Sequence, residues 1–137
     1  MPTVSVADRA SSLTRTPLDS GLLFQAPRPH ALVIGATARV EGLLARLYYQ
    51  LRAPVSHWWP TAVPTPPQPA TGTLVIWGVD ALDRTQQRSL LAWLESSSGE
   101  VQLISVAEGP VFPLVEREEF LDGLYYRLNA VYATIAQ

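Results

Sequence analysis

Apolar positions along the chain fall into two kinds of run, one of strand length and one with helical spacing. Residues 31–34 (ALVI), 73–77 (TLVIW) and 101–106 (VQLISV) are nearly continuous apolar runs, as is typical of strands buried on both faces of a sheet. Between the first two runs, apolar residues recur at the spacing of one helix face over 39–52. This spacing predicts a helix packed back on the first strand.

Two more helices are expected further along the chain. Asp83 and Gln86 have the spacing of a capping box, which predicts a helix that begins there and continues through Leu94. The small residues at 96–99 would end it. A second stretch of apolar residues at helical spacing predicts another helix over 116–128.

The tail at 130–135 favours a fourth strand, because its Val, Tyr, Thr and Ile residues are common in sheets, although it could also extend the preceding helix. Strands that alternate with helices form a parallel sheet with helices on both faces. We therefore expect an α/β fold, a three-layer sandwich with a mostly parallel sheet. In such folds the carboxyl ends of the strands carry the chemistry.

The remaining segments read as a loop and an arm. Six prolines within 54–70 exclude a helix there and favour a surface loop, with at most a brief strand around 57–59. Residues 1–29 hold two short apolar patches and are expected to form an N-terminal arm or edge strands. Residues 30–137 would then form one α/β domain.

Composition narrows the chemistry. The 137 residues have the length of one domain, and a net charge of -2 with ten scattered basic residues argues against direct nucleic-acid binding. All ten are arginine, so any mechanism that needs a lysine is excluded. The absence of cysteine excludes disulfides, thiolate metal sites and thiol nucleophiles.

His30 and His57 stand isolated, so we expect structural or surface roles for them and no metal site. The first residues show no basic segment followed by an apolar core, and no apolar run approaches the length that spans a bilayer. These features predict a soluble, cytoplasmic protein with no membrane partner and no cofactor. Charged residues make up only 16% of the chain, which suggests that a protein partner or a second copy covers part of the surface.

The strand ends lack most of what a nucleoside triphosphatase of this architecture needs. Such an enzyme requires a glycine-rich turn around the phosphates, a lysine on the terminal phosphates and a strand-end acid for magnesium. The turn after the first strand, GATARVEG, keeps Gly35 but neither the further glycines nor the lysine. Trp77 and Gly78 stand where the second strand should deliver acidic groups.

Four segments carry a resemblance to a known family. ALVIGATARVEGLLARL (31–47), GTLVIWGVDALDRTQQRSLLAWL (72–94) and VQLISV (101–106) resemble the ATPase core of bacterial enhancer-binding proteins, the AAA+ activators of sigma-54 RNA polymerase. FLDGLYYRLNAV (120–131) resembles the family's FREDLYYRLNVV, and its LYYRLN string is highly specific. The resemblance covers residues 30–136 and implies a P-loop-type AAA+ fold.

The departures from the family fall on its catalytic positions. The family's Walker A lysine falls on Glu41, and its Walker B acids fall on Trp77 and Gly78. At about 4 Å and an effective dielectric of about 20, a glutamate repels a phosphate charge by roughly 4 kcal/mol, whereas a lysine attracts it by as much. Trp77 cannot hold magnesium. The resemblance therefore implies degenerate nucleotide-binding positions at Gly35, Glu41, Trp77 and Gly78, and no catalytic residue.

Other family elements are altered or missing. The family's sensor position falls near Ala107 and Glu108, the first of its two trans-acting arginines falls on Leu121, and the second matches Arg127. The proline-rich stretch stands where the family has its GAFTGA loop. Neither the helical lid nor the DNA-binding helix-turn-helix of the family is expected.

The resemblance implies an inactive AAA+-like module that acts by protein contact in bacterial transcription regulation or signalling, with itself or a sigma-54 activator ATPase as partner. The candidate interface residues are Trp58, Trp59, Tyr125, Tyr126 and Arg127. The four aromatic residues could instead serve local packing, and Arg127 could instead pair with Glu116, Glu119 or Asp122 on the surface. Competing interpretations are a weak nucleotide-binding ATPase, an ATPase completed with a partner through Arg127, and a decayed remnant without a function.

Overall fold

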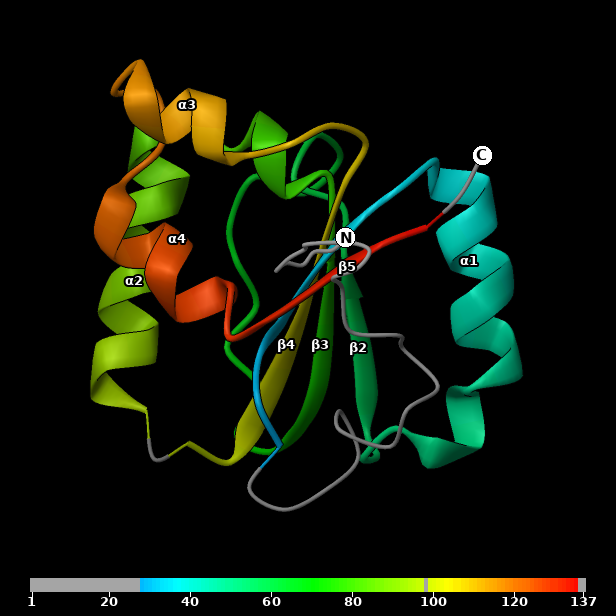
Figure 1. Ribbon diagram of the computed structural model, residues 1–137. Coiled ribbons are helices and arrows are strands. Elements are labelled where there is room, and N and C mark those ends of the chain that lie inside the picture. The colour runs from blue at the N-terminus through cyan, green and yellow to red at the C-terminus, as the bar shows by residue number, and fades with distance from the viewer. Residues whose placement is uncertain (1–27, 98, 136–137) are drawn as a thin grey trace.

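The computed structural model describes residues 28–97 and 99–135, which form a five-stranded sheet flanked by helices (Figure 1). Every pair of neighbouring strands is parallel, and the strand order is β2-β3-β4-β1-β5. The strands are β1 (Ala31–Ile34), β2 (Val55–Trp58), β3 (Gly72–Trp77), β4 (Val101–Ala107) and β5 (Val131–Thr134). The expected α/β fold is confirmed, and the last segment is a strand rather than an extension of the preceding helix.

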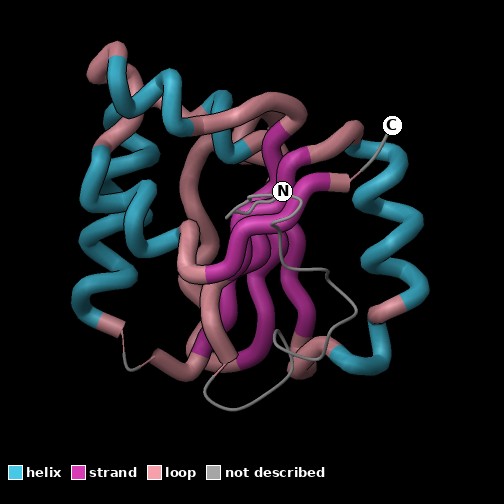
Figure 2. Tube along the Cα trace, in the orientation of Figure 1, coloured by secondary structure: helices cyan, strands magenta, loops and turns pink. Residues whose placement is uncertain are grey.

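The helices divide between the two sides of the sheet, as the tube view also shows (Figure 2). On one side lie α1 (Thr37–Arg46) and the 3-10 turn η3 (Tyr48–Gln50). On the other side lie α2 (Arg84–Ser96), α3 (Phe112–Glu116) and α4 (Asp122–Leu128), while the 3-10 turn η4 (Val79–Ala81) follows β3. The molecule is therefore a three-layer sandwich.

Each side of the sheet has its own apolar cluster. Leu32 and Ile34 of β1 pack into the cluster that includes α2 and α4, whereas Ala31 and Val33 pack into the cluster that includes α1. Successive side chains of a strand point to opposite faces, and all four of these are buried. Burial on both faces is the reason that the strands read as continuous apolar runs.

The helix expected over 39–52 is wrong at both ends, because α1 begins at Thr37 and ends at Arg46. The amide of Leu47 bonds to both Leu43 and Leu44 carbonyls, and η3 follows with 3-10 bonds. These tighter bonds satisfy carbonyls that the helix end would leave free. Leu47 and Leu51 remain buried, which explains why their helical spacing extends past the helix itself.

The proline-rich stretch begins with β2 and is otherwise irregular, so the brief strand expected at 57–59 is confirmed but lies at 55–58. The loop is tied to its surroundings by two side chains. Trp58 donates its indole N–H to the Val63 carbonyl at 2.6 Å, and Gln86 donates its amide to the Pro64 carbonyl at 2.9 Å. The loop is therefore held against β2 and the start of α2.

The capping box at the start of α2 is confirmed. The backbone N–H of Gln86 donates to the Asp83 carboxylate at 2.8 Å, and the backbone N–H of Asp83 donates to the Gln86 side-chain oxygen at 2.9 Å. The reciprocal pair satisfies two donors that the helix start would leave free. The local sequence signal therefore places the start of α2 correctly.

The single helix expected over 116–128 is wrong. One short helix, α3, ends at Glu116 and has Pro113 in its first turn, and a second, α4, begins only at Asp122. Gln87 of α2 explains the break, because its side chain accepts the Leu121 N–H at 2.8 Å and donates to the Glu119 carbonyl at 3.0 Å. These backbone groups are satisfied by a side chain instead of by a continuous helix.

The expected arm over residues 1–29 lies outside the described residues except for Arg28 and Pro29. Arg28 donates to the Gln50 carbonyl at 2.9 Å, at the end of η3. His30 has a structural role, since its Nδ1 accepts the Leu103 N–H at 3.0 Å. Across the part of the chain that is described, none of the helices has the length and apolar character needed to cross a membrane.

Replacing Gln87 should destabilise the fold strongly. Gln87 is 1% exposed and also donates to the Leu82 carbonyl at 2.9 Å, so Gln87→Met leaves three backbone groups without this partner. We expect the free energy of unfolding, measured by urea denaturation, to fall by about 2–4 kcal/mol. The exposed neighbour Arg88→Met is the control and should change it by less than about 0.5 kcal/mol. A Gln87 variant as stable as the control would contradict this role.

Candidate functional site

The carboxyl ends of the central strands converge at one edge of the sheet, where Gly35, Gly78 and Glu108 follow β1, β3 and β4. The Gly35 N–H donates to the Ala107 carbonyl and the Gly78 N–H donates to the Val106 carbonyl, each at 2.9 Å. The sheet pairing thus continues one residue past β1 and β3. The residues that the sequence places at the strand ends do meet in space.

Both glycines at this edge are needed by the backbone. A Cβ on Gly35 would lie 2.8 Å from the Cβ of Ile135, closer than side-chain carbons approach one another. Gly78 has a φ of 86°, in the left-handed region that favours glycine. Glycine at these two positions is therefore explained by the fold alone.

A carboxylate of the chain itself occupies the start of α1. Ala36, the N-cap residue, has no side-chain acceptor, and the first turn of α1 contains no acid. Glu108 supplies the acceptor and the negative charge. Its carboxylate accepts hydrogen bonds from the Thr37 hydroxyl at 2.9 Å and from the Thr37 backbone N–H at 3.4 Å. The free amides and the dipole of a helix start favour an anion at this place. In a nucleotide-binding fold, phosphate takes that position.

A second acid lies near Glu108. Asp80 of η4 is half-buried, and burial is the main reason that its pKa lies above the ordinary value. Its own backbone hydrogen bond opposes this shift, while the Glu108 carboxylate adds to it. The strand-end edge therefore carries two interacting acids. The electrostatic environment there disfavours a further anion.

Trp77 is packed and hydrogen-bonded at the end of β3. It is 5% exposed, its indole N–H donates to Nδ1 of His57 at 3.1 Å, and its ring stacks on Trp59 with centroids 5.0 Å apart. The side chain belongs to the cluster on the α1 side of the sheet. An aromatic stack thus fills the space beside this strand end.

A cleft of about 380 Å³ lies between α1 and the neighbouring strands. One wall comes from α1 and the residues after it: Glu41, Leu44, Ala45, Tyr48 and Leu51. The floor and far side come from β2 and β3: Val55, His57, Trp59, Val75 and Trp77. Of the four degenerate positions, the structure brings Glu41 and Trp77 to this cleft, whereas Gly35 and Gly78 lie in the turns at the strand ends.

The candidate interface residues separate into buried and exposed members. Trp58 and Tyr125 are 2% and 8% exposed, so both serve local packing. Trp59 and Tyr126 are 41% and 64% exposed. Trp58, the last residue of β2, packs into the cluster on the α2 side of the sheet, whereas Trp59, the next residue, stacks on Trp77 on the α1 side.

Arg127 lies at the surface of α4 and does not form the ion pair considered from the sequence. Among the described residues, salt bridges join Arg52 to Glu100 and Arg117 to Glu119, but none within 4.0 Å includes Arg127. The Arg127 guanidinium affects the pKa of His30. Burial first, and the Arg127 guanidinium second, hold the pKa of His30 below its ordinary value.

Sequence reasoning missed two features of this region. The bond between Thr37 and Glu108 joins residues 71 positions apart, and the bond between Trp77 and His57 joins residues 20 apart. The first bond could have been predicted, because the residues after two strands of a parallel sheet lie at the same edge of that sheet. Within residues 28–97 and 99–135, no three His, Asp or Glu side chains gather as a metal site would require.

Comparison with solved structures finds similar folds in NtrX from Brucella abortus. The complex with ADP has a TM-score of 0.64 at 18% identity, covering 78% of this chain and 32% of that one. The complex with ATP has a TM-score of 0.63 at 19% identity, covering 96% and 40%. A further NtrX structure gives 0.62 at 16% identity, covering 79% and 32%.

The chain thus spans about a third of the length of these NtrX chains, and the likeness establishes a related α/β fold. Comparisons with protein-family models and with curated proteins give no match.

Removing the Glu108 carboxylate should destabilise the start of α1. Because Glu108→Ala deletes the acceptor of two Thr37 donors, we expect the free energy of unfolding to fall by about 1 kcal/mol. Chemical denaturation measures this change. Glu116→Ala, at an exposed position of α3, is the control. The pKa of Asp80, followed by carboxyl NMR, should fall towards its ordinary value because one repelling charge is gone. A Glu108 variant that leaves both quantities unchanged would show that the interaction has no role in solution.

Proposed function

We propose that the chain is a catalytically inactive AAA+-like module, related to sigma-54 transcriptional activators, that works through protein contacts in bacterial transcription regulation or signalling. The observation that carries this proposal is the Glu108 carboxylate bonded to Thr37 at the start of α1. An internal anion holds the place that a bound phosphate needs. The motif resemblance and the shared fold with NtrX support the relationship.

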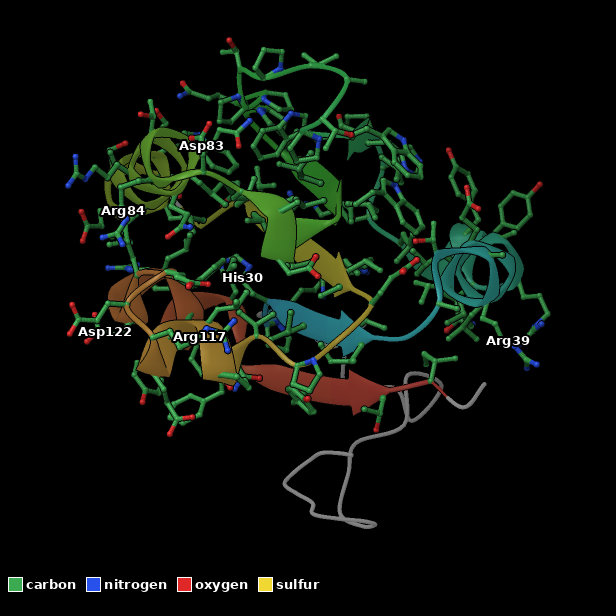
Figure 3. The ribbon with its side chains drawn as sticks, turned by 90° about the horizontal axis from the view of Figure 1, so that it is seen from above. His30, Arg39, Asp83, Arg84, Arg117 and Asp122 are labelled. Carbon is green, nitrogen blue, oxygen red and sulfur yellow. The ribbon has the colours of Figure 1, made fainter. Side chains whose placement is uncertain are left out.

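Electrostatics argue against phosphate binding at this edge. A phosphate at the start of α1 would approach Glu108 and the nearby Asp80. At about 4 Å and an effective dielectric of about 20, each charge pair repels by roughly 4 kcal/mol. Arg39, in the first turn of α1, points away from the sheet (Figure 3) and offers no compensating charge there.

The metal-binding side of an ATPase site is replaced as well. Trp77 stands where the family has its first Walker B acid, and it is held by His57 and Trp59. An indole N–H is only a donor and cannot ligate magnesium. NtrX was solved with ADP and with ATP, and this chain shares that fold with Trp77 and Glu108 at the ends of its strands.

The surface proposed for protein contact lies on α3 and α4. Phe112 and Tyr126 are 41% and 64% exposed. The Tyr125 ring lies between them, with its centroid 5.6 Å from that of Phe112 and 5.3 Å from that of Tyr126. Arg127 is exposed beside them. Aromatic side chains and arginine are the residues that most often anchor interfaces. The proposed occupant is a second copy of this chain or a sigma-54 activator ATPase.

An ATPase completed with a partner is the second candidate. It is favoured by Arg127, which is exposed and has no salt bridge with any described residue. In that case Arg127 would act on a nucleotide held by the partner, and the strand-end edge of this chain would still take none.

Sedimentation equilibrium tests the interaction role. At about 100 µM we expect the full chain to self-associate, or to associate with a sigma-54 activator ATPase core when the two are mixed. Tyr126→Ser should weaken that association about tenfold, because it removes an exposed aromatic anchor. Tyr49→Ser is the matched control, since Tyr49 is 97% exposed but follows α1 on the other side of the sheet. A wild-type chain that is monomeric alone and in the mixture, or equal behaviour of the two variants, would overturn the proposal.

A further inference from the structure

The cleft beside α1 is built from regular positions of three elements. Leu44 and Ala45 each lie three or four residues from Glu41 and from Tyr48, which places all four on one face of α1 and its extension into η3. Along the sheet, His57 pairs with Val75, and Trp77 lies two residues beyond Val75 on the same face. Most of the cleft is therefore set by α1 and the sheet, while Trp59, which follows β2, is placed by its stacking on Trp77.

Two partly exposed aromatic rings line this cleft from different sides. Tyr48 comes from η3 and is 48% exposed, and Trp59 directly follows β2 and is 41% exposed. Trp59 is backed by Trp77 with an interplanar angle of 10°, and Trp77 is fixed by its bond to His57. An aromatic wall that is already ordered loses little freedom when a ligand binds.

The charge at the cleft has one sign. Glu41 is the only acidic side chain among the residues that line it, and no arginine lines it. Aromatic faces attract cations through their ring quadrupole, and a carboxylate adds a direct attraction. An anion would meet only repulsion from Glu41.

The lining also determines which kind of cation fits. Apart from Glu41, His57 and the Tyr48 hydroxyl, the lining side chains are apolar or indole rings, and Nδ1 of His57 already accepts from Trp77. A trimethylammonium group has no N–H donors to satisfy, so it loses little on entering such a site. The volume of about 380 Å³ suits a small ligand.

We propose that this cleft binds a small organic cation with a trimethylammonium head, held between Tyr48 and Trp59 with Glu41 as the counter-charge. The site lies on the α1 side of the sheet and reaches the end of β3 at Trp77, but its lining includes neither Thr37 nor Glu108. It is also separate from the α3 and α4 surface proposed for protein contact, so either proposal can fail alone.

Nitrogen-15 NMR of the full chain tests the site through the indole N–H signals of its tryptophans. Choline is the probe, and 3,3-dimethyl-1-butanol is its neutral counterpart of equal shape. We expect choline to shift the signals of Trp59 and Trp77 but not that of Trp93 on α2. The neutral alcohol should bind about tenfold more weakly, because it lacks the charge.

Two variants test the counter-charge. Glu41→Gln should weaken choline binding about tenfold and leave the binding of the neutral alcohol unchanged. Glu95→Gln, at an exposed position of α2, is the matched control and should leave the binding of both ligands unchanged. Equal affinity of choline and the alcohol for the wild-type chain would overturn the proposal without any variant, since it would show an apolar site only. The absence of Trp59 and Trp77 shifts with choline would also overturn it, since it would show that the cleft is closed or otherwise occupied.

Discussion

The contact between Glu108 and Thr37 sets the character of the strand-end edge. A helix that starts against parallel strands presents free amides and a positive dipole end, which favour an anion. Here the anion comes from the residue directly after β4, and the parallel pairing of β1 with β4 brings it into place. Because the carboxylate is covalently part of the chain, it reaches the start of α1 without the loss of translational freedom that a free anion would suffer on binding.

Several residues at the same edge have clear structural roles. Gly35 and Gly78 are required by a close approach and by a left-handed backbone. Trp77 remains a buried strand residue, and its ring stacks sideways with Trp59 over the α1 side of the sheet. Gly35, Gly78 and Trp77 are therefore each accounted for by the backbone or the packing of this fold. The open cleft lies between this stack and α1, and its lining includes neither Thr37 nor Glu108.

Local signals predicted the fold well, and long-range contacts produced its exceptions. Buried parallel strands read as apolar runs and the capping box of Asp83 and Gln86 is a three-residue pattern, so both were visible in the sequence. The break between α3 and α4 depends on Gln87, which bonds backbone groups 32 and 34 residues away. No periodicity within 116–128 could reveal it.

The candidate site was predicted in part, for the same physical reason. Glu41 and Trp77 were identified because they depart from a family pattern at single positions, and both line the cleft. The hydrogen-bond partners at this edge depended on the fold: Trp77 bonds to His57, and Glu108 bonds to Thr37. The burial of Trp58 and Tyr125, against the exposure of Trp59 and Tyr126, depended on which face of each element meets the core. Adjacent residues of one type could not be told apart before the register was known.

The central claim is that the chain's own groups close the strand-end edge to nucleotides, and calorimetric titration with ATP tests it most directly. The account predicts no saturable heat with the full chain up to about 1 mM ATP, with or without Mg²⁺. Saturable one-to-one binding with a dissociation constant in the micromolar range would contradict it.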